Sequence, residues 1–110
     1  FAEKFLQQTE YKFIERNWRC RLGEIDIIFT HGKDYVFVEV KALIKQSNAF
    51  QPEDHLNFAK QRKLIQLARV YMNYKHPGER GYQIDMVAID LDKNLGLVDI
   101  RHYPNAIADI

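Results

Sequence analysis

Hydrophobic and polar residues alternate along much of this chain, with the period of two that is typical of β-strands. The alternation is clearest in two neighbouring stretches, residues 24–30 and 35–41, where Val, Ile, Phe and Tyr fill most apolar positions. Weaker alternation or short apolar runs predict three more strands, at residues 11–18, 81–90 and 95–103. The pattern therefore predicts about five strands.

Two other stretches carry apolar residues at helical spacing. The first is residues 1–8, and the second is residues 58–76, which follow a candidate N-cap at Asn57 and end before Pro77. Residues 43–57 have mixed polarity and predict a long loop. The resulting order is helix, three strands, helix, two strands, which predicts an α/β fold with a mixed sheet flanked by helices.

Composition narrows the class of protein. With 110 residues, 46% of them hydrophobic, the chain can bury a core and does not resemble a disordered segment. Apolar runs never exceed four residues, so no transmembrane helix or signal-peptide core is expected. The single Cys20 cannot form an internal disulfide, which favours a reducing, intracellular compartment. We expect one domain over residues 1–110, and a native start upstream of Phe1.

The net charge of +1 hides an uneven distribution. Residues 23–40 carry one Lys and four acids, whereas residues 41–80 carry eight Lys/Arg and three acids, a net of +5. A near-neutral total argues against a nucleic-acid binder, but a basic middle segment argues for one. The basic side chains of the second helix are candidates for phosphate contacts, and a solvated helix face explains them equally well; they are Lys60, Arg62, Lys63 and Arg69.

The two best strands predict a hairpin that gathers charged residues. If Gly32 and the next residue form a two-residue loop, the numbers of paired residues add up to 65, and glycine there suits a type II′ turn. Asp26 then lies opposite Glu39, and Glu24 lies opposite Lys41. Because residues two apart share a face of a strand, all four side chains project from the same side.

Two facing carboxylates repel each other, and partial burial increases the cost. A divalent cation between Asp26 and Glu39 would remove that repulsion, and oxygen ligands suit Mg²⁺ or Mn²⁺. Lys41 could then hold an attacking water and offset negative charge in a transition state. The alternative is a surface ion-pair quartet, with Glu24 paired to Lys41 and the other acids turned toward water.

The residues also resemble a known signature. An Asp on one strand with Glu-x-Lys on the next is similar to the core motif of the PD-(D/E)XK nuclease superfamily, matched here by Asp26 and by Glu39 to Lys41. More closely, the chain resembles the YraN-like family of small bacterial, endonuclease-related proteins. The matching segments are residues 16–20, 23–26, 36–41, 60–64, 85–88 and 100–106. The resemblance implies a restriction-endonuclease-like core, similar to that of archaeal Holliday junction resolvases.

That resemblance implies roles for individual residues. Asp26 and Glu39 match the metal ligands, with the Val40 carbonyl beside them, and Lys41 matches the catalytic lysine. Gln61 matches a polar helix position near such sites. Related proteins place a further glutamate in the first helix, at a position before Phe1, and Glu3 is the candidate that stands nearest to it here.

Three functions remain open at this point. The first is a Mg²⁺- or Mn²⁺-dependent endonuclease acting on branched DNA in the bacterial cytoplasm, with a homodimer supplying two active sites. The second is a non-catalytic nucleic-acid-binding or scaffolding domain that keeps the nuclease fold. The third is a metal-linked protein-interaction module without a nucleic-acid role. Both nucleic-acid hypotheses predict weak, salt-sensitive DNA binding.

Overall fold

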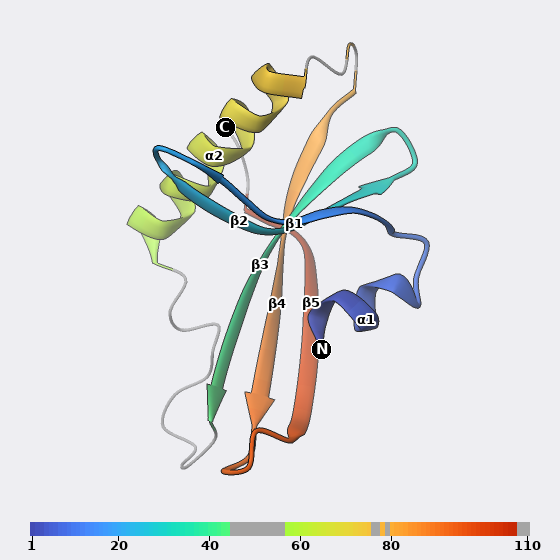
Figure 1. Cartoon of the computed structure of the whole chain (residues 1–110), viewed down its shortest axis with the longest axis vertical. Coiled ribbons are helices and arrows are strands. Elements are labelled where there is room, and N and C mark those ends of the chain that lie inside the picture. The colour runs from blue at the N-terminus through green and yellow to red at the C-terminus, as the bar shows by residue number, and fades with distance from the viewer. Residues whose placement is uncertain (45–56, 76–77, 79, 108–110) are drawn as a thin grey trace.

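The computed structural model describes residues 1–44, 57–75, 78 and 80–107. These residues form two helices and five strands (Figure 1). The elements in chain order are α1 (Ala2–Gln7), β1 (Lys12–Cys20), β2 (Gly23–His31), β3 (Asp34–Ile44), α2 (Phe58–Lys75), β4 (Tyr82–Leu91) and β5 (Leu97–Ile107). Neither of these helices is long and apolar enough to cross a membrane.

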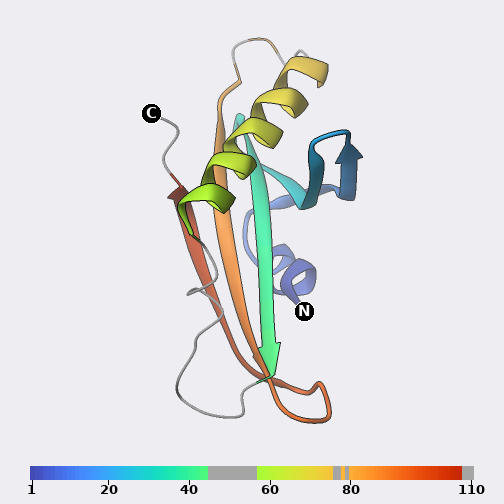
Figure 2. The ribbon, with the colours of Figure 1, turned by 90° about the vertical axis from the view of Figure 1, so that its left-hand side faces the viewer.

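The strands form one mixed sheet in the order β1-β2-β3-β4-β5. Neighbouring strands are antiparallel except β3 and β4, which run parallel and are connected through α2. The two helices cover opposite faces of this sheet, as the perpendicular views in Figures 1 and 2 show. The predicted α/β architecture, with a five-stranded mixed sheet flanked by helices, is therefore confirmed.

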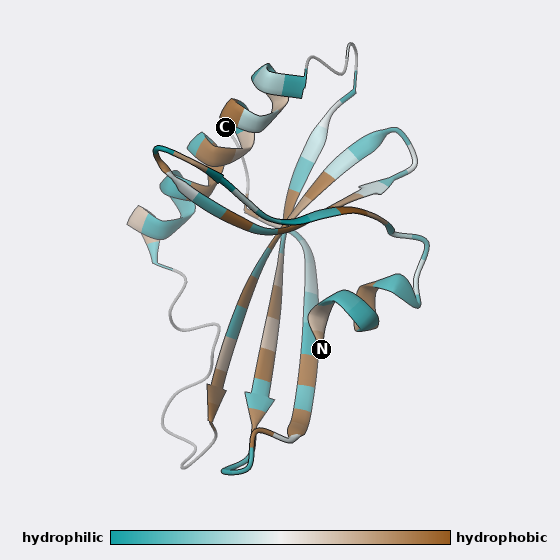
Figure 3. Ribbon diagram, in the orientation of Figure 1, coloured by the Kyte–Doolittle hydropathy of each residue, from teal (hydrophilic) through white to brown (hydrophobic). Residues whose placement is uncertain are grey.

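Each face of the sheet buries its own hydrophobic cluster. The α2 cluster joins helix and strand residues, namely Ile25, Ile28, Phe37, Leu64, Leu67, Ala68, Tyr71, Ile84 and Ile107. The α1 cluster consists of Ala2, Leu6, Ile27, Phe29, Val36, Val38, Val87 and Ile89. Brown bands on β3 and β4 in Figure 3 mark these apolar positions, and teal bands between them mark polar residues within the strands.

The ends of several elements differ from the prediction. Strand β3 continues to Ile44, into the stretch predicted as a loop, because it pairs with β4 along residues 35–44. Likewise β5 extends to Ile107 because its end pairs with Ile84 of β4. The remainder of the predicted loop, residues 45–56, lies outside the described residues.

The predicted hairpin register is confirmed close to the turn and fails farther away. The β2–β3 ladder runs from His31 opposite Asp34 to Ile27 opposite Val38, and Gly32 has a φ of 62°, as the turn requires. Beyond Ile27, β2 continues to pair only with β1. Ile25 consequently packs in the α2 cluster, while Ile27 packs in the α1 cluster, so the strict alternation predicted for this strand is wrong there.

Candidate functional site

The candidate site forms where β2 leaves β3. Asp26 is the first residue of β2 beyond the last pair of the β2–β3 ladder. Its Oδ2 accepts a hydrogen bond of 2.8 Å from the Val40 N–H of β3, so a side chain forms the bond between the two strands at this point. Because Val40 follows Glu39 directly, this bond places the Asp26 carboxylate next to Glu39 on β3. The two acids are therefore brought together, although by a side-chain clamp instead of the direct cross-strand pairing that the hairpin predicted.

Glu39 is a buried acid whose Oε2 has an ion-pair partner but no hydrogen-bond donor among the described residues. Its side chain is 10% exposed, and its Oε2 has no hydrogen-bond partner among the described residues. The Lys60 ammonium lies 3.0 Å from this oxygen, as an ion pair without hydrogen-bond geometry. The pKa of Glu39 is raised to about 7, first because burial desolvates the carboxylate, and second because Asp26 accepts a hydrogen bond from the protonated acid and repels the charged form, with Lys60 acting in the opposite direction.

Lys41 and Gln61 stand close in the sequence to Glu39 and Lys60, respectively. Lys41 is half-buried and stands two residues after Glu39 on β3, hence on the same face of the sheet, opposite Ala88 of β4. Gln61 is half-buried in the first turn of α2 and follows Lys60 directly. The residues of the site thus come from three places: the first turn of α2, the end of the β2–β3 ladder and the middle of β3.

Two sequence-based assignments around the site are wrong. Glu24 does not pair with Lys41: its carboxylate accepts a 3.0 Å hydrogen bond from Arg19, which is its neighbour on β1. Glu3 does not join the acidic pair either, because Arg16 holds it with two hydrogen bonds of 2.9 Å. Glu3 belongs to α1, on the face of the sheet opposite to α2, so it is not a candidate ligand (Figure 2).

Helix α2 presents basic side chains to solvent, and one of them also reaches the acidic pair. Lys60, Arg62, Lys63 and Arg69 are all exposed. Lys60 precedes the buried Leu64 by four residues, so its side chain starts on the side of the helix that faces the sheet. Its ammonium reaches Glu39 for this reason. The i, i+4 spacing already present in the sequence could have revealed this position.

The predicted N-cap sets where α2 begins. The Asn57 side chain accepts a 2.9 Å hydrogen bond from the Lys60 N–H, and its backbone carbonyl accepts one of 3.0 Å from the Gln61 N–H. This cap fixes the first turn of the helix, which is the turn that carries both site residues. The N-cap prediction is confirmed.

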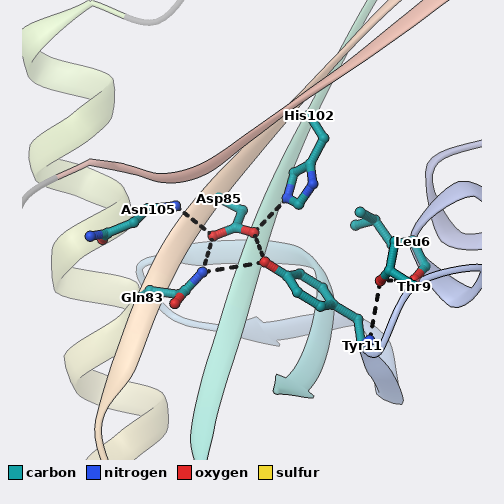
Figure 4. A network of polar contacts seen from close by, with 7 residues as sticks. All are labelled: Leu6, Thr9, Tyr11, Gln83, Asp85, His102 and Asn105. Atoms are coloured by element: carbon teal, nitrogen blue, oxygen red, sulfur yellow. Dashed lines mark hydrogen bonds and ion pairs between the residues drawn. The ribbon is translucent and has the colours of Figure 1, made fainter. Parts of the chain in front are cut away.

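A second polar cluster, not foreseen from the sequence, surrounds Asp85 on β4 (Figure 4). Asp85 is fully buried, and its carboxylate accepts hydrogen bonds from four donors. They are the Tyr11 hydroxyl at 2.6 Å, the Gln83 amide at 2.8 Å, the His102 Nε2 at 2.6 Å and the Asn105 backbone N–H at 2.8 Å. Burial and the bond to Asp85 raise the pKa of the Tyr11 hydroxyl, which therefore stays protonated.

The Asp85 network stabilises the fold and lies apart from the acidic pair. Asp85 shares its face of β4 with Val87 of the α1 cluster, whereas Glu39 faces α2. All lone-pair positions of its carboxylate are engaged by donors from β4, β5 and the residue preceding β1. The only sequence signal for this network is an Asp inside an apolar run, and it does not reveal the partners.

The chain is similar in sequence to the members of one protein family. A family model described as "Uncharacterised protein family UPF0102" matches residues 1–89. A UPF0102 protein of Roseiflexus castenholzii is 35% identical over 109 residues, which cover 98% of this chain and 87% of the relative. A UPF0102 protein of Thermotoga maritima is 45% identical over 71 residues, covering 64% of this chain and 63% of that protein. The resemblance to a YraN-like family is confirmed at this level.

A solved structure also matches, at a greater distance. It is described as "The structure of Pyrococcus Furiosus SfsA in complex with Ca2+" and aligns with a TM-score of 0.42 and 17% sequence identity. The alignment covers 98% of this chain, and the chain spans 60% of the length of that protein. A likeness at this level supports no conclusion about function.

Proposed function

This chain belongs to the uncharacterised protein family UPF0102, and we propose that it is a metal-dependent endonuclease that hydrolyses phosphodiester bonds in structured DNA. One observation carries the proposal: two adjacent carboxylates, Asp26 and Glu39, leave a buried oxygen without a hydrogen-bond partner among the described residues. Lys41 lies on the same face, and the basic helix α2 adjoins it. The PD-(D/E)XK signature in the sequence supports the same assignment.

The residues at the site fit a divalent cation. Asp26 uses Oδ2 for the Val40 N–H and has a second carboxylate oxygen that could bind an ion, and Glu39 offers the buried Oε2. A strand residue directs its N–H and C=O toward the same neighbour, so we expect the Val40 carbonyl to face Asp26 as well. These are hard oxygen donors, which suit Mg²⁺ or Mn²⁺. Asp26, Glu39 and Val40 would therefore hold the ion.

Lys41 is the residue that we assign to the hydrolytic step. When bound, the metal ion would stabilise negative charge on the reacting phosphate. The Lys41 ammonium would position the attacking water by a hydrogen bond and offset the charge that develops in the transition state. Attack on phosphorus breaks the bond to the leaving 3′ oxygen and yields a 3′ hydroxyl and a 5′ phosphate. Gln61, in the first turn of α2, would orient the water or the phosphate.

The exposed cations of α2 provide the expected contacts to the DNA backbone. Arg62, Lys63 and Arg69 lie on the helix whose first turn borders the acidic pair, so a phosphate chain along the helix would lead to the site. The net charge of +1 makes this binding weak and salt-sensitive. Symmetric cleavage of a branched substrate needs two sites, for which a homodimer is expected. We place this activity in the bacterial cytoplasm, where the single Cys20 remains reduced.

The test of this function is cleavage of labelled junction, flap and single-stranded DNA in the presence of Mn²⁺. Asp26→Asn is the control, because its amide oxygen can still accept the Val40 N–H while the carboxylate charge is lost. We expect the wild type to cleave a structured substrate and Asp26→Asn to lose at least a hundredfold in rate. Equal cleavage by both proteins would identify a contaminating nuclease and refute the proposal.

A second candidate is a non-catalytic nucleic-acid-binding domain that keeps the nuclease fold. One observation favours it: within residues 1–44, 57–75, 78 and 80–107, no three His, Cys, Asp or Glu side chains gather at one place, so Asp26 and Glu39 would have to hold an ion without a third ionisable ligand. Titration calorimetry with Mn²⁺ separates the two candidates. Binding that disappears in Glu39→Gln supports the enzyme, whereas salt-sensitive DNA binding without any Mn²⁺ affinity supports the second candidate.

A further inference from the structure

Lys60 and Glu39 form an unusual ion pair, in which one partner is buried and the other is free to move. The Glu39 side chain is 10% exposed, while that of Lys60 is 50% exposed. The buried carboxylate is held by β3, at the centre of the sheet, whereas the ammonium ends a flexible four-carbon chain on the first turn of α2. The cation can therefore leave without any change of the backbone.

The pair contrasts with Asp85, another buried carboxylate among the described residues. Asp85 has four hydrogen-bond donors, which come from several elements and satisfy it permanently. Glu39 Oε2 has the Lys60 charge at 3.0 Å but no hydrogen bond among the described residues. A buried charge needs compensation, yet the compensation here is electrostatic and not directional. Such a position can accept one cation in exchange for another.

We propose that Lys60 is a tethered counter-ion, which neutralises Glu39 in the metal-free protein and is displaced when a divalent cation binds there. This inference rests on the proposed function, because it assumes that Asp26 and Glu39 bind Mg²⁺ or Mn²⁺. Once displaced, the ammonium swings out to the surface of α2 and becomes available to a DNA phosphate. Lys60 thus links occupancy of the metal site to the strength of DNA binding.

Two consequences follow from this exchange. Removing the ammonium removes a competitor for the carboxylates, so metal affinity should rise when Lys60 is replaced by a neutral residue. Because linkage is reciprocal, DNA that captures the displaced ammonium also strengthens metal binding by the same factor. A lysine that served only to stabilise the fold would predict neither effect.

The experiment is calorimetric titration with Mn²⁺ at pH 8.0, above the pKa of Glu39, on the wild type, Lys60→Met and Lys63→Met. Lys63→Met is the matched control: it removes one positive charge from the same helix, but the Lys63 side chain lies against Gly23, so that its Cε would be 3.4 Å from a Cβ at that glycine. We expect Lys60→Met to bind Mn²⁺ about tenfold more tightly than the wild type. Lys63→Met should stay within about twofold.

The outcomes separate this inference from the proposed function. If the wild type binds Mn²⁺ and Glu39→Gln does not, but Lys60→Met shows unchanged or weaker affinity, the counter-ion role is refuted and the metal site stands. If neither the wild type nor Lys60→Met binds Mn²⁺, both the metal site and the counter-ion role fail. Thermal denaturation of each variant checks that the fold is intact before the titration.

A second readout follows Lys60 to the DNA. In a Lys41→Gln background, which blocks cleavage, the dependence of DNA affinity on salt is measured with Mn²⁺ and with EDTA. Release of one ammonium to a phosphate should make the slope of log K against log salt steeper by about one unit when Mn²⁺ is present. This change should be absent in the Lys60→Met version of the same protein. An equal change in both proteins would refute the release of Lys60.

Discussion

Replacing Glu39 by glutamine should stabilise the metal-free protein at pH 8 and have little effect at pH 4.5. The unfolded chain ionises this carboxyl group near its ordinary pKa of 4.5, whereas the folded chain holds the pKa at about 7. The folded state therefore binds the proton more tightly, and its stability is complete below pH 4.5 and declines as the pH rises to 7. Above pH 7 the stability contributed by this group no longer changes with pH.

The size of the loss in unfolding free energy follows from the rise in the pKa of Glu39. A raised pKa corresponds to about 1.4 kcal/mol for each unit, so the rise from 4.5 to about 7 amounts to about 3 kcal/mol. Glutamine keeps the shape of the side chain but carries no charge at any pH. We therefore expect Glu39→Gln to exceed the wild type by about 3 kcal/mol at pH 8, in the free energy of unfolding measured with EDTA present.

The assay is urea denaturation of both proteins at intervals between pH 4.5 and 8, with Glu24→Gln as a control. Glu24 is partly exposed and pairs with Arg19 at the surface, so its replacement should change the stability by less than about 1 kcal/mol at every pH. A difference in stability between Glu39→Gln and the wild type that stays constant over the pH range would refute the reasoning, since the ionised form of Glu39 would then cost the folded state nothing.

Three further predictions concern the fold and the DNA surface. Asp85→Asn should destabilise the protein by about 3 kcal/mol in urea denaturation, because a fully buried acceptor of four hydrogen bonds would face donors with an NH₂ group, and Mn²⁺ affinity should not change. Asn57→Ala should lower stability by about 1 kcal/mol through loss of the α2 cap, with Asn57→Ser near the wild type; equal losses in both would contradict the capping role. Arg62→Ala and Arg69→Ala should each weaken DNA binding and reduce its salt slope by about one unit, in a filter-binding or fluorescence titration; slopes equal to that of the wild type would exclude phosphate contacts.

The turn-proximal part of the hairpin could be predicted from sequence because its causes are local. Strand period and the Gly32 turn fix which residues face each other for five pairs, from His31 opposite Asp34 to Ile27 opposite Val38. The prediction fails where β2 leaves β3 and continues with β1 alone. The departure accompanies the packing of Ile25 against α2, a tertiary contact that no pattern in the hairpin encodes.

The sequence predicts which residues form the candidate site, but it does not predict the hydrogen bonds and ion pairs between them. Asp26 and Glu39 were identified as a pair, yet the bond from the Val40 N–H to Asp26 arises from the end of the ladder. The contact of Lys60 with Glu39 follows from the spacing of Lys60 to Leu64, because residues four apart share a face of a helix. Asp85 was beyond prediction, since its donors come from sequence positions up to 74 residues away.

The bond between the Val40 N–H and Asp26 has a practical consequence for watching this protein in solution. Most amides of a sheet are protected from exchange with solvent deuterium by backbone carbonyls, but the Val40 amide is protected by the Asp26 carboxylate oxygen. The exchange rate of one amide thus reports on one side chain. Asn at position 26 retains an acceptor oxygen and should keep that amide slow, whereas alanine should release it. The exchange rate of the Val40 amide, followed by NMR, would then separate the structural role of Asp26 from its role as a proposed metal ligand.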